Sequence, residues 1–192
     1  MTSISLRDVA RNAVRDQVVR SAWDLFVERG FDGTTVDQIA EAAGMSRRTF
    51  FRYFAGKDEL ILDKLLEVGD HVAAALAARP ADEAAWPALR ASLDVVVTAQ
   101  DQFPEPSRRL AVLLRDEPGT RGTIEERRRR WTDTLGPLVA ERLRHHSLTA
   151  GRAVAGAALA CYDAATDAWI EAPGTLLATH LDTTMQAVTA AT

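Results

Sequence analysis

Residues 34–57 read TTVDQIAEAAGMSRRTFFRYFAGK, a pattern that predicts two short helices joined by a tight turn. Thr35 is placed to cap the first helix, and Gln38, three residues later, completes a capping box. Gly44 ends this helix, because glycine tolerates the left-handed backbone that a sharp turn between helices requires. Ser46 then caps the second helix. We therefore predict a helix-turn-helix, the unit in which a second helix reads the major groove of DNA.

The second helix combines basic, hydroxyl and aromatic side chains. Its first turn offers arginine and threonine side chains to base edges, and its later part offers arginine, tyrosine and lysine side chains to phosphates. The ring of Phe51 can contact a thymine methyl group. With two residues from the start of the first helix, the predicted DNA-contact residues are Thr35, Val36, Ser46, Arg47, Arg48, Thr49, Phe51, Arg52, Tyr53 and Lys57.

A third helix is predicted to cover the apolar side of this pair. Apolar residues of the pair recur at steps of three and four, and the preceding stretch carries a matching stripe that ends at Gly30. We therefore expect a three-helix head. The apolar set of the pair is Ile39, Ala40, Ala43, Met45, Phe50 and Phe54, and that of the covering helix is Val18, Ala22, Leu25 and Phe26.

Over about residues 15–62 the chain resembles the tetracycline-repressor (TetR) family of bacterial transcription regulators. The resemblance implies an all-helical fold, DNA binding by the head and a homodimer. In outline, the C-terminal half is similar to the actinobacterial branch with a mycofactocin-regulator-like C-terminal domain. The matching residues are Ala22, Leu25, Phe26, Gly30, Phe31, Thr34, Thr35, Val36, Ile39, Ala40, Ala43, Gly44, Ser46, Thr49, Phe50, Phe51, Tyr53, Phe54, Lys57, Glu59 and Leu60.

Two positions depart from the family pattern. Phe51 stands where tyrosine is usual, which removes a hydroxyl that often binds phosphate. Gly56 stands where a polar cap usually precedes Lys57.

The remainder of the chain reads as a helical bundle whose joints are marked by prolines and glycines. The pattern favours an all-α protein of about nine helices, with a helix-turn-helix domain at residues 1–56 and a ligand-binding and dimerisation domain at residues 57–192. The helices expected after the head cover about residues 57–78, 83–102, 106–115, 123–146, 149–172 and 177–188.

Length and composition fit a small cytoplasmic protein. The chain has 192 residues, its only cysteine is Cys161, and it holds no run of about 18 apolar residues. We therefore predict no intramolecular disulfide and no membrane span. The sequence has no catalytic triad, phosphate loop or metal cluster, so we expect neither enzyme activity nor a cofactor or metal.

The charge is unevenly divided along the chain. The net charge is −4, but residues 1–57 hold nine Lys or Arg and seven Asp or Glu, whereas residues 58–192 hold 14 and 20. This asymmetry suits a DNA-binding head on a body that phosphates repel.

Two further basic stretches allow more than one interpretation. Arg7, Arg11 and Arg15 recur every four residues, so they form either an extension that reaches DNA or a solvated helix face. Residues 127–130 are four arginines that follow Glu125 and Glu126, which favours an exposed face with internal ion pairs over a second DNA site.

The helix at about residues 149–172 is apolar on more than one side, so it is expected to be buried on more than one side. We interpret its side of small residues as the surface that meets a second copy in a four-helix dimer interface. The alternative is burial within one large monomer. The predicted interface residues are Ala153, Ala157, Ala160, Ala164, Ala168, Leu181 and Met185.

Gly136 and Pro137 interrupt the helix predicted at residues 123–146, and proline inside a helix usually bends it. We expect the bend to open a pocket for a small apolar or amphipathic effector, such as a lipid or acyl-type molecule. Ordinary core packing is the alternative. The candidate lining is Trp86, Leu93, Phe103, Leu110, Trp131, Leu135, Tyr162, Thr166 and Trp169.

These patterns together predict a homodimeric, ligand-responsive repressor. Two heads would read a pseudopalindromic double-stranded DNA operator, and effector binding would move the helix that starts near Lys57. The alternative is a DNA-binding regulator without a small-molecule effector, controlled by a protein partner or by its abundance.

Overall fold

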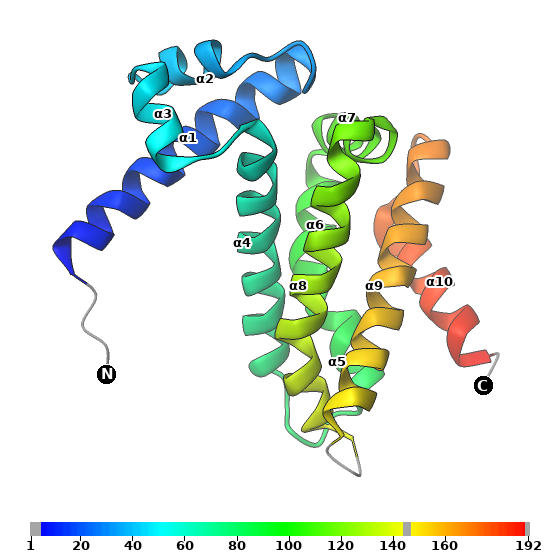
Figure 1. Cartoon of the computed structure of the whole chain (residues 1–192). Helices are drawn as coiled ribbons and strands as arrows, with labels where there is room; N and C mark the ends of the chain where they lie inside the picture. Colours follow the sequence, from blue (N-terminus) through cyan, green and yellow to red (C-terminus); the bar gives the residue numbers. More distant parts are fainter. Residues whose placement is uncertain (1–4, 144–146, 191–192) are drawn as a thin grey trace.

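The computed structural model describes residues 5–143 and 147–190, and within these ranges the chain forms helices and no strand (Figure 1). The prediction of an all-α protein is confirmed. The elements are α1 (Leu6–Arg29), α2 (Val36–Ala42), α3 (Arg47–Tyr53), α4 (Lys57–Ala77), α5 (Ala85–Ser92), α6 (Asp94–Gln102), α7 (Pro104–Asp116), the short 3₁₀ helix η1 (Pro118–Thr120), α8 (Arg121–Ala140), α9 (Leu148–Glu171) and α10 (Leu177–Ala190).

Helices α1 to α3 form the head, and its local signals act as the sequence predicts. Thr35 and Gln38 form the capping box of α2, and Ser46 caps α3 through a bond from the backbone N–H of Thr49. Gly44 adopts a φ of 70°, the left-handed conformation expected at the turn. Leu60 of α4 is also part of the head's core, so the first turns of α4 pack with the head.

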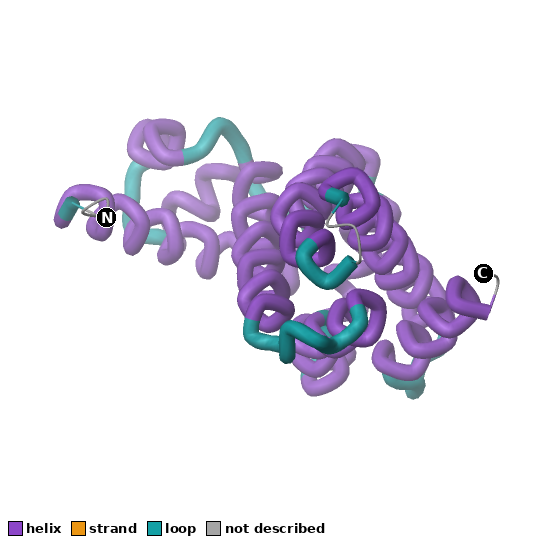
Figure 2. The backbone as a smooth tube through the Cα atoms, turned by 90° about the horizontal axis from the view of Figure 1, so that it is seen from below, coloured by secondary structure: helices purple, strands orange, loops and turns teal. Residues whose placement is uncertain are grey.

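The body is a bundle in which α4, α8 and α9 run side by side and α10 packs on the far side of α9 (Figure 1). Helices α5, α6 and α7 complete it, and seen from below the head lies to one side of this bundle (Figure 2). Leu113 and Leu114 of α7 pack against the core of the head, so the head touches the body beyond α4. No helix in the described ranges combines the length and the apolar character needed to cross a membrane.

Three element boundaries differ from the prediction. The helix expected at residues 83–102 is divided into α5 and α6 at Leu93, where the hydroxyl of Ser92 donates to the carbonyl of Leu89 and competes with the helix's own bonds. Helix α8 begins at Arg121 rather than Thr123, and Thr120 before it bonds back to the carbonyl of Leu114. It ends at Ala140, and residues 144–146 of the predicted helix lie outside the described residues.

The bend expected at Gly136 and Pro137 does not open a pocket there. Helix α8 continues through both residues, and Gly136 is buried against α9. A Cβ at Gly151 of α9 would lie 2.3 Å from the carbonyl oxygen of Gly136, so the two backbones touch at this point. The small residues therefore serve a close helix crossing that fills the space.

Candidate DNA-binding surface and effector site

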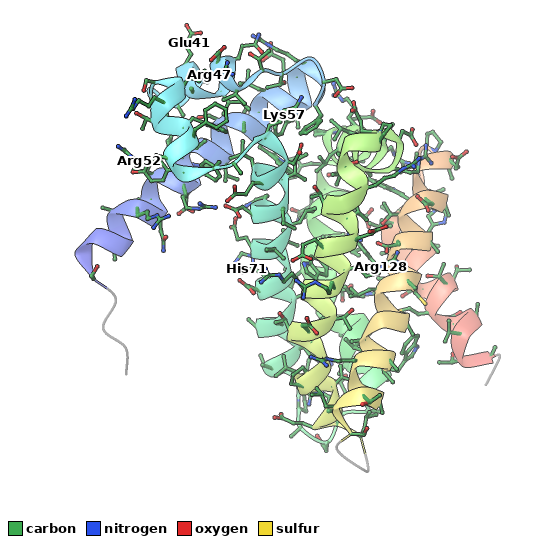
Figure 3. The ribbon with its side chains drawn as sticks, in the orientation of Figure 1. Glu41, Arg47, Arg52, Lys57, His71 and Arg128 are labelled. Carbon is green, nitrogen blue, oxygen red and sulfur yellow. The ribbon has the colours of Figure 1, made fainter. Side chains whose placement is uncertain are left out.

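Helix α3 presents its basic side chains on the side of the head that faces away from the body. Arg47 and Arg52 both project there (Figure 3). Arg47, Arg48 and Arg52 are exposed, whereas Phe50 between them is fully buried in the head's core. The packing of Phe50 fixes which face of α3 is free. The basic face is therefore held on a rigid support.

Arg47 is held in place by two neighbours. Its Nη1 donates to Asp37 of α2 at 2.8 Å, and its guanidinium lies 5.4 Å from the ring centre of Phe51. Both members of the ion pair are more than half exposed, so water screens it strongly. An acceptor on a base edge can therefore compete for Arg47 at little cost.

Phe51 remains 47% exposed, an uncommon state for a phenylalanine side chain. Together with Arg48, Thr49 and Arg52 it lines a hollow of about 660 Å³ on α3. Phe51, which stands where tyrosine is usual in the family, therefore places an apolar ring among cationic groups. This combination suits contact with a thymine methyl group beside phosphates.

Lys57 has a role within the protein that the sequence analysis did not predict. Its Nζ donates to the carbonyls of Phe31 at 2.6 Å and Thr34 at 3.3 Å, and lies 4.0 Å from the ring centre of Phe31. The ammonium group therefore ties the start of α4 to the loop before α2. Two of the three ammonium donors are directed at backbone carbonyls, so Lys57 links parts of the protein as well, and its contact with phosphate stays a prediction.

Arg15 also belongs to the interior link between head and body. Its guanidinium donates to the carbonyl of Tyr53 at 2.6 Å and forms ion pairs with Glu59 and Asp63 of α4. The interpretation of Arg15 as part of a DNA-reaching extension is therefore wrong. Arg11 is exposed, and the side chain of Arg7 lies outside the described side chains.

Most of the predicted effector residues meet in the core of the body. Leu93, Trp131, Leu135, Tyr162 and Trp169 are buried in one cluster. Half-buried Trp86 packs against this cluster, whereas Leu110 and Thr166 are partly exposed.

Phe103 is 65% exposed, so it does not line an enclosed site. It lies at the joint between α6 and α7, where it is the residue before Pro104.

Trp131 links this core to α4. Its Nε1 donates to the carbonyl of Leu65 at 2.9 Å, and its ring lies against Gly69. On the other side it stacks on Tyr162, with 6.5 Å between ring centres. The hydroxyl of Tyr162 donates to Gln100 of α6 at 2.8 Å. One tryptophan thus connects α8, α9 and the helix that carries the head.

Arg127 is a residue whose role the sequence analysis missed. It is 7% exposed rather than on a solvated face, and its Nη2 donates to Asp163 of α9 at 2.5 Å. A signal was available, because Arg127 precedes Trp131 and Leu135 at steps of four and shares their buried stripe. The other three arginines of the run, at positions 128–130, are exposed as expected.

An open apolar groove lies at the other end of the body. It has a volume of about 580 Å³ and lies between the start of α5, the residues after α8, and α9 and α10. Of the predicted effector residues only Trp86 lines it, together with Leu143, Val154 and Val188. Ala153 and Ala157 of the predicted dimer surface form its edge on α9.

The small residues of α9 form a surface strip. Ala153, Ala160, Ala164 and Ala168 are exposed and Ala157 is half-buried. Leu181 and Met185 are instead 0% and 3% exposed, because their stripe of α10 packs into the core of the same chain. The assignment of these two residues to the dimer surface is therefore corrected.

Two family models match separate parts of the chain. Residues 18–63 match the family model described as bacterial regulatory proteins, tetR family. Residues 83–192 match the model of the MftR C-terminal domain.

Two curated relatives match mainly through the head. The HTH-type transcriptional regulator TcmR of Streptomyces glaucescens is 45% identical over 78 residues, which cover 41% of this chain and 34% of TcmR. RutR of Escherichia coli (strain K12) is 31% identical over 102 residues, which cover 53% of this chain and 48% of RutR. The chain thus spans about a third to a half of the length of these relatives.

Among solved structures, FadR of Thermus thermophilus, a TetR-family transcriptional repressor in complex with lauroyl-CoA, matches over the body as well. The TM-score is 0.57 and the identity 26%, over 90% of this chain and 91% of that one. The relatives are transcriptional regulators rather than enzymes. The MftR C-terminal domain model alone covers more than half of the chain, so the chain belongs to the TetR family of bacterial regulatory proteins and carries an MftR C-terminal domain.

Proposed function

We propose that this TetR-family regulator binds a pseudopalindromic DNA operator as a homodimer and is released by a small apolar or amphipathic effector. The observation that carries the DNA-binding part is the exposed basic face of α3. Arg47, Arg48 and Arg52 project from a helix whose buried side is fixed by Phe50. Exposed arginines at the start of a recognition helix, as Arg47 and Arg48 are, suit bidentate contact with guanine.

The homodimer is supported by the exposed alanine strip of α9. Small side chains allow two helices to approach closely, and in a twofold contact each copy offers the same surface. The strip lies on α9, which is separated from α4 by α8 (Figure 1). A contact between two such strips would therefore leave both heads free. Two heads would then meet successive major grooves on one side of the duplex.

The effector part rests on the contact between the body's core and α4. A ligand that inserts beside Trp131 must displace its ring, and that ring bonds Leu65 and lies against Gly69. Displacement would therefore shift α4 and the head that it carries. A TetR-family repressor of similar fold binds lauroyl-CoA, which makes an acyl-type effector the first class to test.

The experiment has two steps. DNA fragments selected by the purified protein from its own genome should share one pseudopalindromic site, and lauroyl-CoA should then be titrated against the labelled site while operator binding is followed by fluorescence anisotropy. Release by lauroyl-CoA but not by free coenzyme A supports an acyl-type effector. A selected pool without a shared site would overturn the DNA-binding proposal itself.

The second candidate is a DNA-binding regulator without a small-molecule effector. The observation that favours it is the dense packing of Leu93, Trp131, Leu135, Tyr162 and Trp169, each of which is no more than 5% exposed. Retention of operator binding in the presence of apolar compounds that bind the body would select this candidate. The selected operator would be the same in both cases.

A further inference from the structure

Arg127 is a charged group placed inside the apolar core of the body. Its side chain is 9% exposed, and its guanidinium lies 5.5 Å from the ring centre of Trp131 and 5.9 Å from that of Tyr162. Burial of a guanidinium is costly unless its donors are satisfied. The Nη2 group is satisfied by Asp163, but Nε is buried without a hydrogen-bond acceptor among the described residues.

The charges around Arg127 do not balance. Arg127 and Arg128 both form their ion pairs with the single carboxylate of Asp163. Arg128 is 51% exposed and lies between α8 and α9 at the surface, so water satisfies its remaining donors (Figure 3). The side chain of Arg127 is only 9% exposed, and water does not reach its Nε. The buried side of this cluster therefore keeps a positive charge and an unused donor.

The groups around this donor have the character of a ligand site. The centres of the stacked rings of Trp131 and Tyr162 both lie within 5.9 Å of the guanidinium, and the hydroxyl of Tyr162 lies in the same core. Thr123, one helical turn before Arg127, is also buried. Binding sites for small molecules combine apolar walls with a few convergent polar groups in this way.

We infer that Arg127 is the polar anchor of the effector site and that the effector is an apolar molecule ending in a carboxylate or a similar anionic oxygen group. The inference rests on the proposed function, because it names the chemistry recognised at the same site. An oxygen of the ligand would accept the Nε hydrogen bond, and its charge would balance the guanidinium. The apolar part of the ligand would lie against Trp131, so the anchor and the contact with α4 are adjacent.

The test compares two probes that differ only at their polar end, decanoate and decan-1-ol. Binding is measured by equilibrium dialysis of the radiolabelled probes, and folding is checked by circular dichroism. The wild-type protein should bind decanoate at least about tenfold more tightly, because a hydrogen bond between charged groups contributes that much. Arg127→Met should remove this preference while leaving decan-1-ol binding within about twofold, since methionine keeps the apolar volume.

Arg128→Met is the matched control, because it removes a neighbouring arginine from the same carboxylate without changing the core. It should leave the preference for decanoate intact. Asp163→Asn should raise the affinity for decanoate about tenfold, because Arg127 loses its internal counter-ion and becomes free for the ligand. If Arg127 serves only to join α8 to α9, Asp163→Asn should instead weaken both probes.

Arg127→Lys provides a second variant if Arg127→Met does not fold, because lysine keeps the charge but lacks the Nε donor and should lose most of the preference. Equal binding of both probes to the wild-type protein would overturn the anchor while leaving an apolar effector in place. Binding of neither probe would overturn both the anchor and the apolar effector. If Arg127→Met lost affinity for decanoate and decan-1-ol equally, Arg127 would be assigned a structural role instead.

Discussion

Trp131 of α8 occupies the space that a side chain at Gly69 of α4 would need. A Cβ at position 69 would lie 2.3 Å from the Nε1 atom of Trp131 and 2.7 Å from its Cε2 atom. The ring cannot retreat easily, because it is 3% exposed and lies between α4 and Tyr162. This glycine therefore fixes the distance between α8 and the helix that joins body to head.

Gly69→Ala should push the ring of Trp131 out of this position. Overpacking of a filled core costs about 1–3 kcal/mol, so the variant should unfold at lower urea concentration than the wild-type protein. Gly122→Ala is a suitable control, because no atom lies within 4 Å of its added Cβ, and its stability should be unchanged or slightly higher. Equal stability of Gly69→Ala and wild type would mean that the contact is loose.

Arg47→Ala should relax DNA specificity rather than abolish binding. Loss of a bidentate contact with guanine costs about 1–3 kcal/mol at one position of each half-site. Arg52→Ala removes an exposed cation from the same helix and should weaken binding to all sequences similarly. It should also reduce the slope of log K against log salt concentration by about one unit. Binding across a library of operator variants separates the two patterns. A uniform loss for Arg47→Ala would assign this residue to the phosphate backbone.

Lys57→Ala should act on the stability of the head. It removes charged hydrogen bonds to the carbonyls of Phe31 and Thr34, each worth about 1.5–3 kcal/mol. Thermal unfolding should therefore begin at a lower temperature, and added operator DNA should recover part of the loss by mass action. Unchanged thermal stability together with weaker DNA binding would assign Lys57 to the phosphate contacts.

Ala164→Arg should prevent dimerisation if the exposed strip of α9 is the interface. A bulky charge there is placed on both copies of a twofold contact, so its effect is doubled. Sedimentation velocity should show a folded monomer with weak operator binding. Ala74→Arg, a change at an exposed position of α4, should remain dimeric. A dimer that survives Ala164→Arg would place the interface elsewhere.

Glu117→Gln should stabilise the contact between head and body in a pH-dependent manner. Burial raises the pKa of the Glu117 carboxyl, and a hydrogen bond with the nearby Asp32 raises it further. A raised pKa means that the folded state prefers the protonated form, so the wild-type protein loses stability as pH rises through this pKa. The variant should therefore have the higher melting temperature at pH 7. The difference should shrink as the pH falls below the usual pKa of a glutamate, and a constant difference would point to another cause.

The head could be predicted in detail because its signals are local. The cap residues Thr35 and Ser46 act within three residues of their partners, so the sequence alone specifies them. Side chains that bond across long distances in sequence were not predictable in this way. Arg15 meets Asp63, and Lys57 meets Phe31, only after the helices have packed.

The sequence correctly predicted that the body is all-helical, but not which residues of its helices face the core and which face outward. Leu181 and Met185 lie on one stripe of α10, but the periodicity does not say which neighbour that stripe meets. The pair Gly136 and Gly151 shows the same limit, because the sequence does not say that α8 and α9 approach each other closely at these two glycines. Arg127 could have been found, since its spacing from Trp131 places it on the buried stripe.

Because Gly69 lies far from the head end of α4, a small tilt of that helix about Gly69 produces a larger movement of the head. At a rise of about 1.5 Å per residue, the contact with Trp131 lies about 18 Å from the end of α4 at Lys57. A tilt of about 5° about that contact would move the attached head by about 1.6 Å, whereas a good hydrogen bond tolerates a range of only about 0.5 Å in donor–acceptor distance. The pivot of such a tilt would be the contact between Gly69 and the indole ring of Trp131. Under the proposed function, a small displacement of this one side chain would therefore be enough to weaken hydrogen bonds between the recognition helix and the bases.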